Sequence, residues 1–390
     1  MKYIAKMMLA LLASVALVIP AYAWDFSASG SMSAKFEQLT EKDNASATAT
    51  TAANFSSASG GISLKSSHTD GDKTLGLTYS ADVDTDGDTL GTDTGLDQTL
   101  SLAGSVKVGK WTASATASQS LMEDGSHAKI SADDDGAITL TDGSITYKLG
   151  DAAHLSTAEK VADTTADGSS EADAEARVDG FNGFSVGLGA GPGTLTIALD
   201  MHSGTTASAL GEDWGASFDA ATACGSGTTA YGVNFSGNVG VDLSATLGMG
   251  SSSASAKTCT GNNSSNTFAS STMGIGVGVP MGAMTLGIDF ESTTVTGKAG
   301  GADIDKLVKG GTQVSVAMGG IADGTVTAAF ASVSSTTGSG EAEARTGLEA
   351  GWKTTVGAAS LEVAYGSWTD NDAAGGDSSS DIEVEMSLSF

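Results

Sequence analysis

Closely spaced acidic side chains are the residues of this sequence that could do chemistry. One run fits the form D-x-D-x-D-G with a further acid at the twelfth position: Asp82, Asp84, Asp86, Asp88 and Asp93. This spacing lets a short loop wrap oxygen ligands around a hard cation, and the glycine permits the sharp turn. The last acid is Asp where Glu is usual, and Asp/Gly-rich loops recur along the chain. Calcium binding and an ordinary solvated loop both stay open, and we expect no required cofactor.

The four histidines do not form a catalytic constellation. Only His202 has a polar neighbour, Asp200, on the same face of a predicted strand. No G-x-S-x-G or similar context supports a nucleophile, and no phosphate-binding loop is present. We therefore expect no catalytic site and no enzyme.

Strands are the elements that must position these side chains. Residues 381–390 alternate strictly, with Ile, Val, Met, Leu and Phe390 at the even positions and Asp, Glu or Ser at the odd ones. Strict alternation predicts a strand with one apolar and one polar face. The same pattern recurs from Trp24 to Tyr365, with residues 127–141 as the least certain stretch.

Residues 1–23 have the features of a cleaved secretory signal peptide. Lys2 and Lys6 form a basic start, residues 7–18 are apolar, and Ala21-Tyr22-Ala23 is an A-x-A cleavage site. The apolar run is too short for a membrane helix. We expect residues 24–390 to form a single mature domain.

Composition narrows the class of protein. The chain has 390 residues with 53 Gly and 3 Pro, and its large apolar residues are sparse. Its net charge of −28 becomes −30 once the two signal lysines are removed. Such acidity argues against nucleic acid as a partner, because phosphates need basic side chains.

The predicted connections alternate in length. Short turns fall near 71, 109, 142, 192, 237, 281, 319–324 and 355, and longer polar loops near 37–57, 83–96, 151–176, 203–228, 251–269, 296–308 and 370–379. Such an alternation of short turns and long loops is typical of an all-β, antiparallel, up-and-down barrel that crosses a membrane. We expect about 18 strands, or 16 if residues 127–141 are not a strand.

Charged residues within the predicted strands avoid the apolar face. A charge facing lipid at mid-membrane costs roughly 2–4 kcal/mol for Arg or Lys, so this segregation predicts an apolar exterior and a polar, water-filled lumen. The expected lumen-lining residues are Lys35, Lys65, Lys107, Lys129, Lys148, Asp200, His202, Asp242, Asp289, Arg345, Glu349, Lys353, Glu362, Glu383 and Glu385.

The chain resembles the outer-membrane general porins of Gram-negative bacteria in its signal, its alternating strands and its closing strand. That resemblance implies that Phe390 is the signal read by the outer-membrane assembly machinery, and that the barrel forms a homotrimer in outer-membrane lipid. Residues 142–151 are similar to the porin stretch that leads into an inward-folded constriction loop, here 151–176. The constriction would then carry Glu159, Lys160, Asp163, Asp167, Glu171, Asp173, Glu175 and Arg177, although the arginine cluster usual in the family is missing. Folded inward, such an acidic constriction favours cations. The alternative is that the segment points outward and that its acids form only a solvated loop.

The two cysteines, Cys224 and Cys259, lie in successive predicted loops outside the membrane. An oxidising compartment favours a disulfide between them, and two separate thiols are the alternative.

The sequence thus predicts a passive, cation-preferring diffusion channel of the outer membrane. A surface-structural or adhesive barrel with a plugged pore and cation-binding loops is the alternative. A substrate-specific channel would need stacked aromatic rings along the lumen. The aromatic residues here fall instead at the apolar positions of the strands, which are predicted to face lipid.

Overall fold

The computed structural model describes residues 24–42, 48–85, 94–123, 126–127, 136–152, 181–202, 226–254, 267–299, 302–336, 342–370 and 376–390. These residues form strands. The first ten are β1 (Asp25–Lys42), β2 (Thr50–Asp70), β3 (Lys73–Thr85), β4 (Thr94–Val108), β5 (Trp111–Glu123), β6 (Ser126–His127), β7 (Gly136–Thr141), β8 (Ile145–Ala152), β9 (Phe181–Ala190) and β10 (Gly193–His202). The others are β11 (Ser226–Asn238), β12 (Asp242–Ala254), β13 (Thr267–Met281), β14 (Met284–Ala299), β15 (Ala302–Ile321), β16 (Gly324–Thr336), β17 (Ala342–Val356), β18 (Ala359–Asp370) and β19 (Ser378–Ser389). No helix among them is long and apolar enough to cross a membrane.

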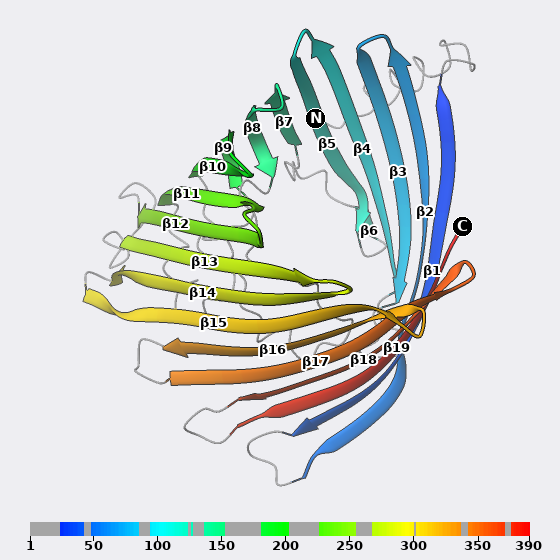
Figure 1. Cartoon of the computed structure of the whole chain (residues 1–390), viewed down its shortest axis with the longest axis vertical. Coiled ribbons are helices and arrows are strands. Elements are labelled where there is room, and N and C mark those ends of the chain that lie inside the picture. The colour runs from blue at the N-terminus through cyan, green and yellow to red at the C-terminus, as the bar shows by residue number, and fades with distance from the viewer. Residues whose placement is uncertain are drawn as a thin grey trace.

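The strands form one closed antiparallel barrel, seen in Figure 1 with the strands in chain order. Apart from β6, each strand pairs with the next along the chain, and β19 pairs with β1. The two-residue β6 pairs only with the end of β5, and β7 takes the next place in the wall. The wall therefore has 18 strands, as predicted, and residues 127–141 do contribute one of them, β7.

The two ends of the barrel differ, because the connections at one end are tight turns. Glycines with positive φ mark this turn end: Gly71, Gly109, Gly143, Gly191, Gly240, Gly282, Gly320 and Gly357. The turn expected near 355 is centred at Gly357, since β17 runs to Val356. At the opposite, loop end, the predicted loops 37–57 and 296–308 are too long. Residues 37–42 continue β1 and residues 50–57 begin β2, and these stretches pair with each other despite their largely polar composition. Residues 296–299 and 302–308 belong to β14 and β15, which pair across a register shift between Val295 and Gly297.

The exterior of the barrel is apolar. Large apolar side chains on the outer parity are exposed; Phe26, Leu247 and Leu149 have exposed fractions of 73%, 60% and 56%. Among the described residues the buried apolar side chains are small ones, namely Ala198, Ala329, Ala331, Val333 and Ala364. A protein that exposes its large apolar residues and buries polar ones is built for lipid outside and water inside. Charged residues on the outer parity occur near strand ends, as Lys42, Asp70 and Lys73 do.

The barrel closes where the two ends of the described chain meet. Gly30 donates its N–H to the Phe390 carbonyl at 2.7 Å, and Phe390 donates its N–H to the Gly30 carbonyl at 2.9 Å. A Cβ at Gly30 would lie 2.5 Å from the Phe390 ring, so the absent side chain leaves the space that the ring occupies. The terminal aromatic residue therefore packs on the first strand at the closing seam.

Candidate functional site

The candidate site is the inner face of the barrel. Strand register places twelve of the predicted lumen residues on this face: Lys35, Lys65, Lys107, Lys148, Asp242, Asp289, Arg345, Glu349, Lys353, Glu362, Glu383 and Glu385. Asp200 and His202 share the inner parity of β10, and Lys129 lies outside the described residues. The role of these residues in lining an open, water-filled lumen stays a prediction.

A row of four charged residues crosses the closing seam. Register aligns Lys353, Glu362, Glu385 and Lys35 on the four neighbouring strands β17, β18, β19 and β1. Lys353 Nζ contacts Glu362 Oε2 at 2.8 Å, and Lys35 Nζ contacts Glu383 Oε1, one step along β19, at 2.8 Å. The two lysines thus offset the repulsion between acidic side chains on the inner face of these neighbouring strands.

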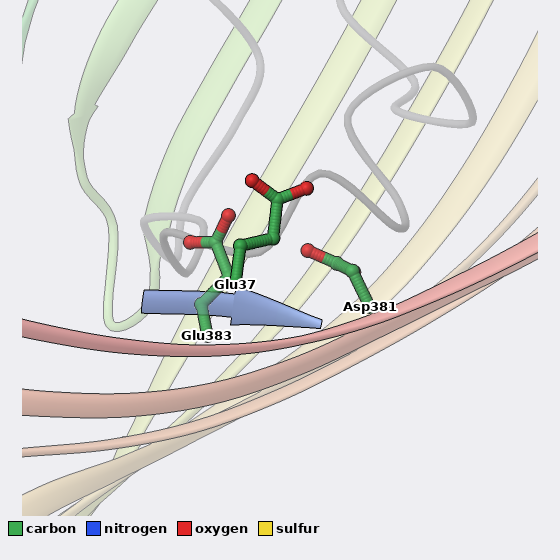
Figure 2. A group of neighbouring side chains, drawn as sticks. All are labelled: Glu37, Asp381 and Glu383. Carbon is green, nitrogen blue, oxygen red and sulfur yellow. The ribbon is translucent and has the colours of Figure 1, made fainter. Parts of the chain in front are cut away.

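Three carboxylates gather beside this row. One oxygen from each of Glu37, Asp381 and Glu383 lies within 4.8 Å of the other two, and Figure 2 shows the three side chains on the same side of β1 and β19. Asp381 and Glu383 are buried. Neither Glu37 nor Asp381 was among the predicted lumen residues, although both continue the polar parity of strands that the sequence had revealed.

Arg345 makes a forked contact at the loop end. Its Nε donates to Asp370 Oδ1 at 2.6 Å and its Nη2 donates to Asp370 Oδ2 at 3.1 Å. The guanidinium also lies 4.3 Å from the centre of the Trp368 ring. Trp368 lies on the same, inner face of β18 as Glu362. The prediction that the aromatic residues face lipid is therefore wrong for Trp368.

Polar side chains are buried on the wall formed by β14 to β17. Asp289, Gln313, Ser315 and Glu349 are each at most 1% exposed. Asp289 is directly paired with Gln313, and Ser315 with Ala329, which in turn pairs with Glu349. Buried polar groups on the inside of a barrel are the reverse of a soluble core, where polar groups are mostly exposed.

The inner charges differ between the two halves of the barrel. On the early strands β2, β3, β4 and β8, inner-facing lysines and acids are mixed: Lys65, Lys107 and Lys148 share this face with Asp82 and Asp97. Between β14 and β19 the acids on the inner parity outnumber the bases; Asp289, Glu291, Glu349, Glu362, Asp370, Asp381, Glu383 and Glu385 stand against Lys309, Arg345 and Lys353. The inner surface as a whole has an excess of negative charge.

The turn that leads toward the predicted constriction segment is rigidly bonded. Asp142 Oδ1 accepts the backbone N–H groups of Ser144 and Ile145, and Asp142 Oδ2 accepts Lys110 Nζ at 2.7 Å. The hydrogen bond from Lys110, followed by those from the backbone, lowers the pKa of the Asp142 carboxyl from 3.8 to about 2. This network holds two neighbouring turns of the barrel together.

Several predicted site residues lie outside the described part of the chain. They are the constriction residues Glu159, Lys160, Asp163, Asp167, Glu171, Asp173, Glu175 and Arg177, the cysteines Cys224 and Cys259, and the loop acids Asp86, Asp88 and Asp93. The first two acids of the calcium pattern, Asp82 and Asp84, are in β3 and share its inner parity.

No protein-family model matches the chain, and no curated protein matches its sequence. Solved structures do match its fold. The outer-membrane channel DcaP of Acinetobacter baumannii has a TM-score of 0.55 at 12% identity, over 95% of this chain and 99% of that one. A BenF-like porin from Pseudomonas fluorescens has a TM-score of 0.54 at 11% identity, over 93% and 99%. OmpT of Vibrio cholerae, in a trimer form, has a TM-score of 0.50 at 9% identity, over 94% and 100%.

These likenesses confirm the fold of outer-membrane porins. A closed 18-stranded barrel with an apolar exterior and a polar interior is a membrane-spanning structure of the outer-membrane type. The predicted location in the outer membrane of a Gram-negative bacterium is confirmed on the same grounds.

Proposed function

We propose that this barrel is a passive channel through which small hydrophilic solutes and ions diffuse across the outer membrane. The observation that carries the proposal is the inverted distribution of side chains. Exposed large apolar residues cover the outside, and charged and hydroxyl side chains line the inside. A lumen with that lining holds water, and a fixed polar opening sorts solutes by size and charge without any chemical step. No enzymatic activity is proposed.

The proposed channel prefers cations. The excess of acids on β14 to β19 supports this preference, because fixed negative charge raises the local concentration of cations and lowers that of anions. The predicted constriction segment 151–176 would add to the same excess, since its acids outnumber its bases.

Single-channel recording in a planar bilayer tests this function. The purified, folded barrel should give stable conductance steps, and a salt gradient should produce a reversal potential of the sign that marks cation flow. An anion-favouring potential would keep the channel and refute its ion preference. A folded barrel that never conducts would refute the channel.

A plugged, structural or adhesive barrel is the second candidate, and one observation favours it. Many of the described inner-facing residues on β9 to β19 are buried, as they would be in an occluded lumen. Absence of conductance from a correctly folded barrel would support this alternative.

Four further proposals concern assembly and the loops. We propose a homotrimer, which cross-linking in native outer membranes would reveal. We also propose a Cys224–Cys259 disulfide, which thiol labelling with and without reductant would reveal. The third proposal is calcium binding at Asp82 to Asp93. For calcium, the midpoint of thermal unfolding should rise with added Ca²⁺ in the parent protein and should not rise in Asp88→Asn. The terminal Phe390 is proposed as the residue that the assembly machinery reads.

A further inference from the structure

The two halves of the lumen differ in how accessible their side chains are. On β9 to β19 many inner-facing residues are fully buried, as Ser244, Ala331 and Glu383 are, each 0% exposed. On β1 to β8 no described inner-facing residue is buried. There the inner-facing Ala103 and Thr116 are exposed instead. The lumen therefore has an open wall, defined as the inner face of β1 to β8, and a covered wall, defined as the inner face of β9 to β19.

We propose that the water-filled path through the barrel follows the open wall, and that permeating solutes contact its side chains and not the buried side chains of the covered wall. This inference rests on the proposed channel function and specifies where in the barrel transport takes place. A residue that water does not reach cannot touch a solute in water, so accessibility to the solvent decides which half of the lumen is the passage.

The open wall offers particular chemistry to a solute. Its inner-facing positions across β2 to β5 include the hydroxyl residues Ser63, Thr78, Ser80, Ser101, Thr116 and Ser118. Hydroxyl groups both donate and accept hydrogen bonds, so they can replace the hydration of sugars, amides and other neutral polar solutes. This wall has no inner-facing aromatic residue on β2 to β5 among the described positions, so stacking is not its means of recognition.

Two exposed ammonium groups complete the open wall. Lys65 and Lys107 face the lumen and are exposed, whereas the acids Asp289, Glu349 and Glu383 of the covered wall are buried. Carboxylates are also within reach of a solute on this path, because the inner-facing Asp82 is exposed and lies beside the half-buried Asp97 in the register of β3 and β4. The preferred solutes are therefore neutral hydroxylated molecules such as sugars, while small inorganic cations respond to the net charge of the whole lumen.

Cysteine accessibility tests the position of the path with a matched pair. Ala103→Cys places a thiol on the open wall, and Ala331→Cys places the same thiol on the covered wall at a residue that is 0% exposed. A charged methanethiosulfonate reagent is added to each folded variant. We expect Ala103→Cys to be labelled more than about tenfold faster, because a buried thiol reacts only when the structure opens locally. Labelling should also reduce the conductance of Ala103→Cys and leave that of Ala331→Cys unchanged.

Two measurements keep this test separate from the test of the channel itself. The labelling rate is read by mass spectrometry on the folded barrel, so it reports the open wall even if no current is recorded. The parent protein with Cys224 and Cys259 sets the baseline for both readouts, and Thr116→Cys with Ser315→Cys forms a second matched pair. Equal labelling rates on the two walls would overturn the inference, as would a current that falls only when the covered wall is modified. A parent protein that never conducts would instead refute the proposed function.

Discussion

Removal of the Lys35 ammonium should strongly destabilise the closing seam. Lys35 Nζ contacts Glu383 Oε1 at 2.8 Å, and the side-chain exposed fractions are 24% for Lys35 and 0% for Glu383. Carboxylate oxygens of Glu37 and Asp381 lie within 4.8 Å of that of Glu383. The substitution Lys35→Met keeps most of the apolar stem and removes only the charge, so it leaves three carboxylates together without this ammonium.

The expected cost follows from these distances. At an effective dielectric constant of 20, opposite unit charges 2.8 Å apart attract by roughly 6 kcal/mol, and like charges 4.8 Å apart repel by roughly 3.5 kcal/mol. Desolvation of the pair offsets a large part of the attraction, and loss of one partner from a buried pair typically costs about 3–5 kcal/mol. Because Lys35 keeps some contact with water, we expect Lys35→Met to lower the free energy of unfolding by about 2–4 kcal/mol.

The assay is urea unfolding in lipid vesicles, followed by the shift in gel mobility between the folded and unfolded barrel. Lys353→Met is the matched control, because Lys353 makes a pair of the same 2.8 Å length with Glu362 but has a 62% exposed side chain. Exposed pairs contribute about 0–1 kcal/mol, so the control should lose little stability. The double variant Lys35→Met/Glu383→Gln should recover part of the loss.

Equal losses from Lys35→Met and Lys353→Met would refute this reasoning. So would a double variant less stable than Lys35→Met alone, because that result would mean that the repulsion among the carboxylates is not what the ammonium relieves.

Three further predictions concern the lumen, the seam and a turn. Lys65→Glu reverses an exposed inner charge and should shift the reversal potential in a salt gradient toward cations. The ratio of cation to anion permeability should change by about twofold to fivefold, and the change should shrink at high salt. An unchanged reversal potential would contradict the proposal that ions pass along the open wall. Gly30→Leu should slow assembly of the folded barrel and weaken its closure, since even a Cβ at this position would press on the Phe390 ring. Gel mobility followed over time measures this assembly, and a normal rate would show that the ring can move aside. Asp142→Asn should lower the free energy of unfolding above pH 4, and its difference from the parent should disappear as the pH falls through about 2. The pKa of Asp142 is lowered in the folded protein, so its contribution to stability is present above the ordinary pKa of 3.8 and is lost on protonation. A difference that persists below pH 2 would assign the loss to the turn and not to the charge on the carboxylate that binds Lys110.

The sequence by itself determined the strands and their faces. Alternation is a local property, because successive side chains of a strand point to opposite sides whatever the strand pairs with. The even residues of 382–390 are therefore apolar and outer, and Glu383 and Glu385 are inner, as predicted. The tight turns at Gly71, Gly109 and Gly143 were predictable for the same reason, since turn chemistry lies in a few consecutive residues.

The limits of the strands at the loop end were not predictable from composition. Residues 37–42 are largely polar, and residues 302–308 lack a regular apolar alternation, so hydrophobicity gave no clear strand signal in either stretch. Pairing with a long neighbouring strand nevertheless satisfies their backbone groups and keeps them extended. Trp368 was misplaced for a related reason, because an aromatic residue suggests lipid while its parity in β18 places it inside.

Only the tertiary structure decided which inner-facing residues meet and which of them are buried. Glu37, Asp381 and Glu383 come together because the first and last strands pair in one particular register across the closing seam, and sequence spacing carries no information on that register. Burial of Asp289 and Glu383, in contrast to exposure of Lys65 and Ala103, likewise depends on what each wall of the lumen faces. Parity fixes the side of a strand on which a residue lies, whereas contacts and access to water arise only when the whole barrel has closed.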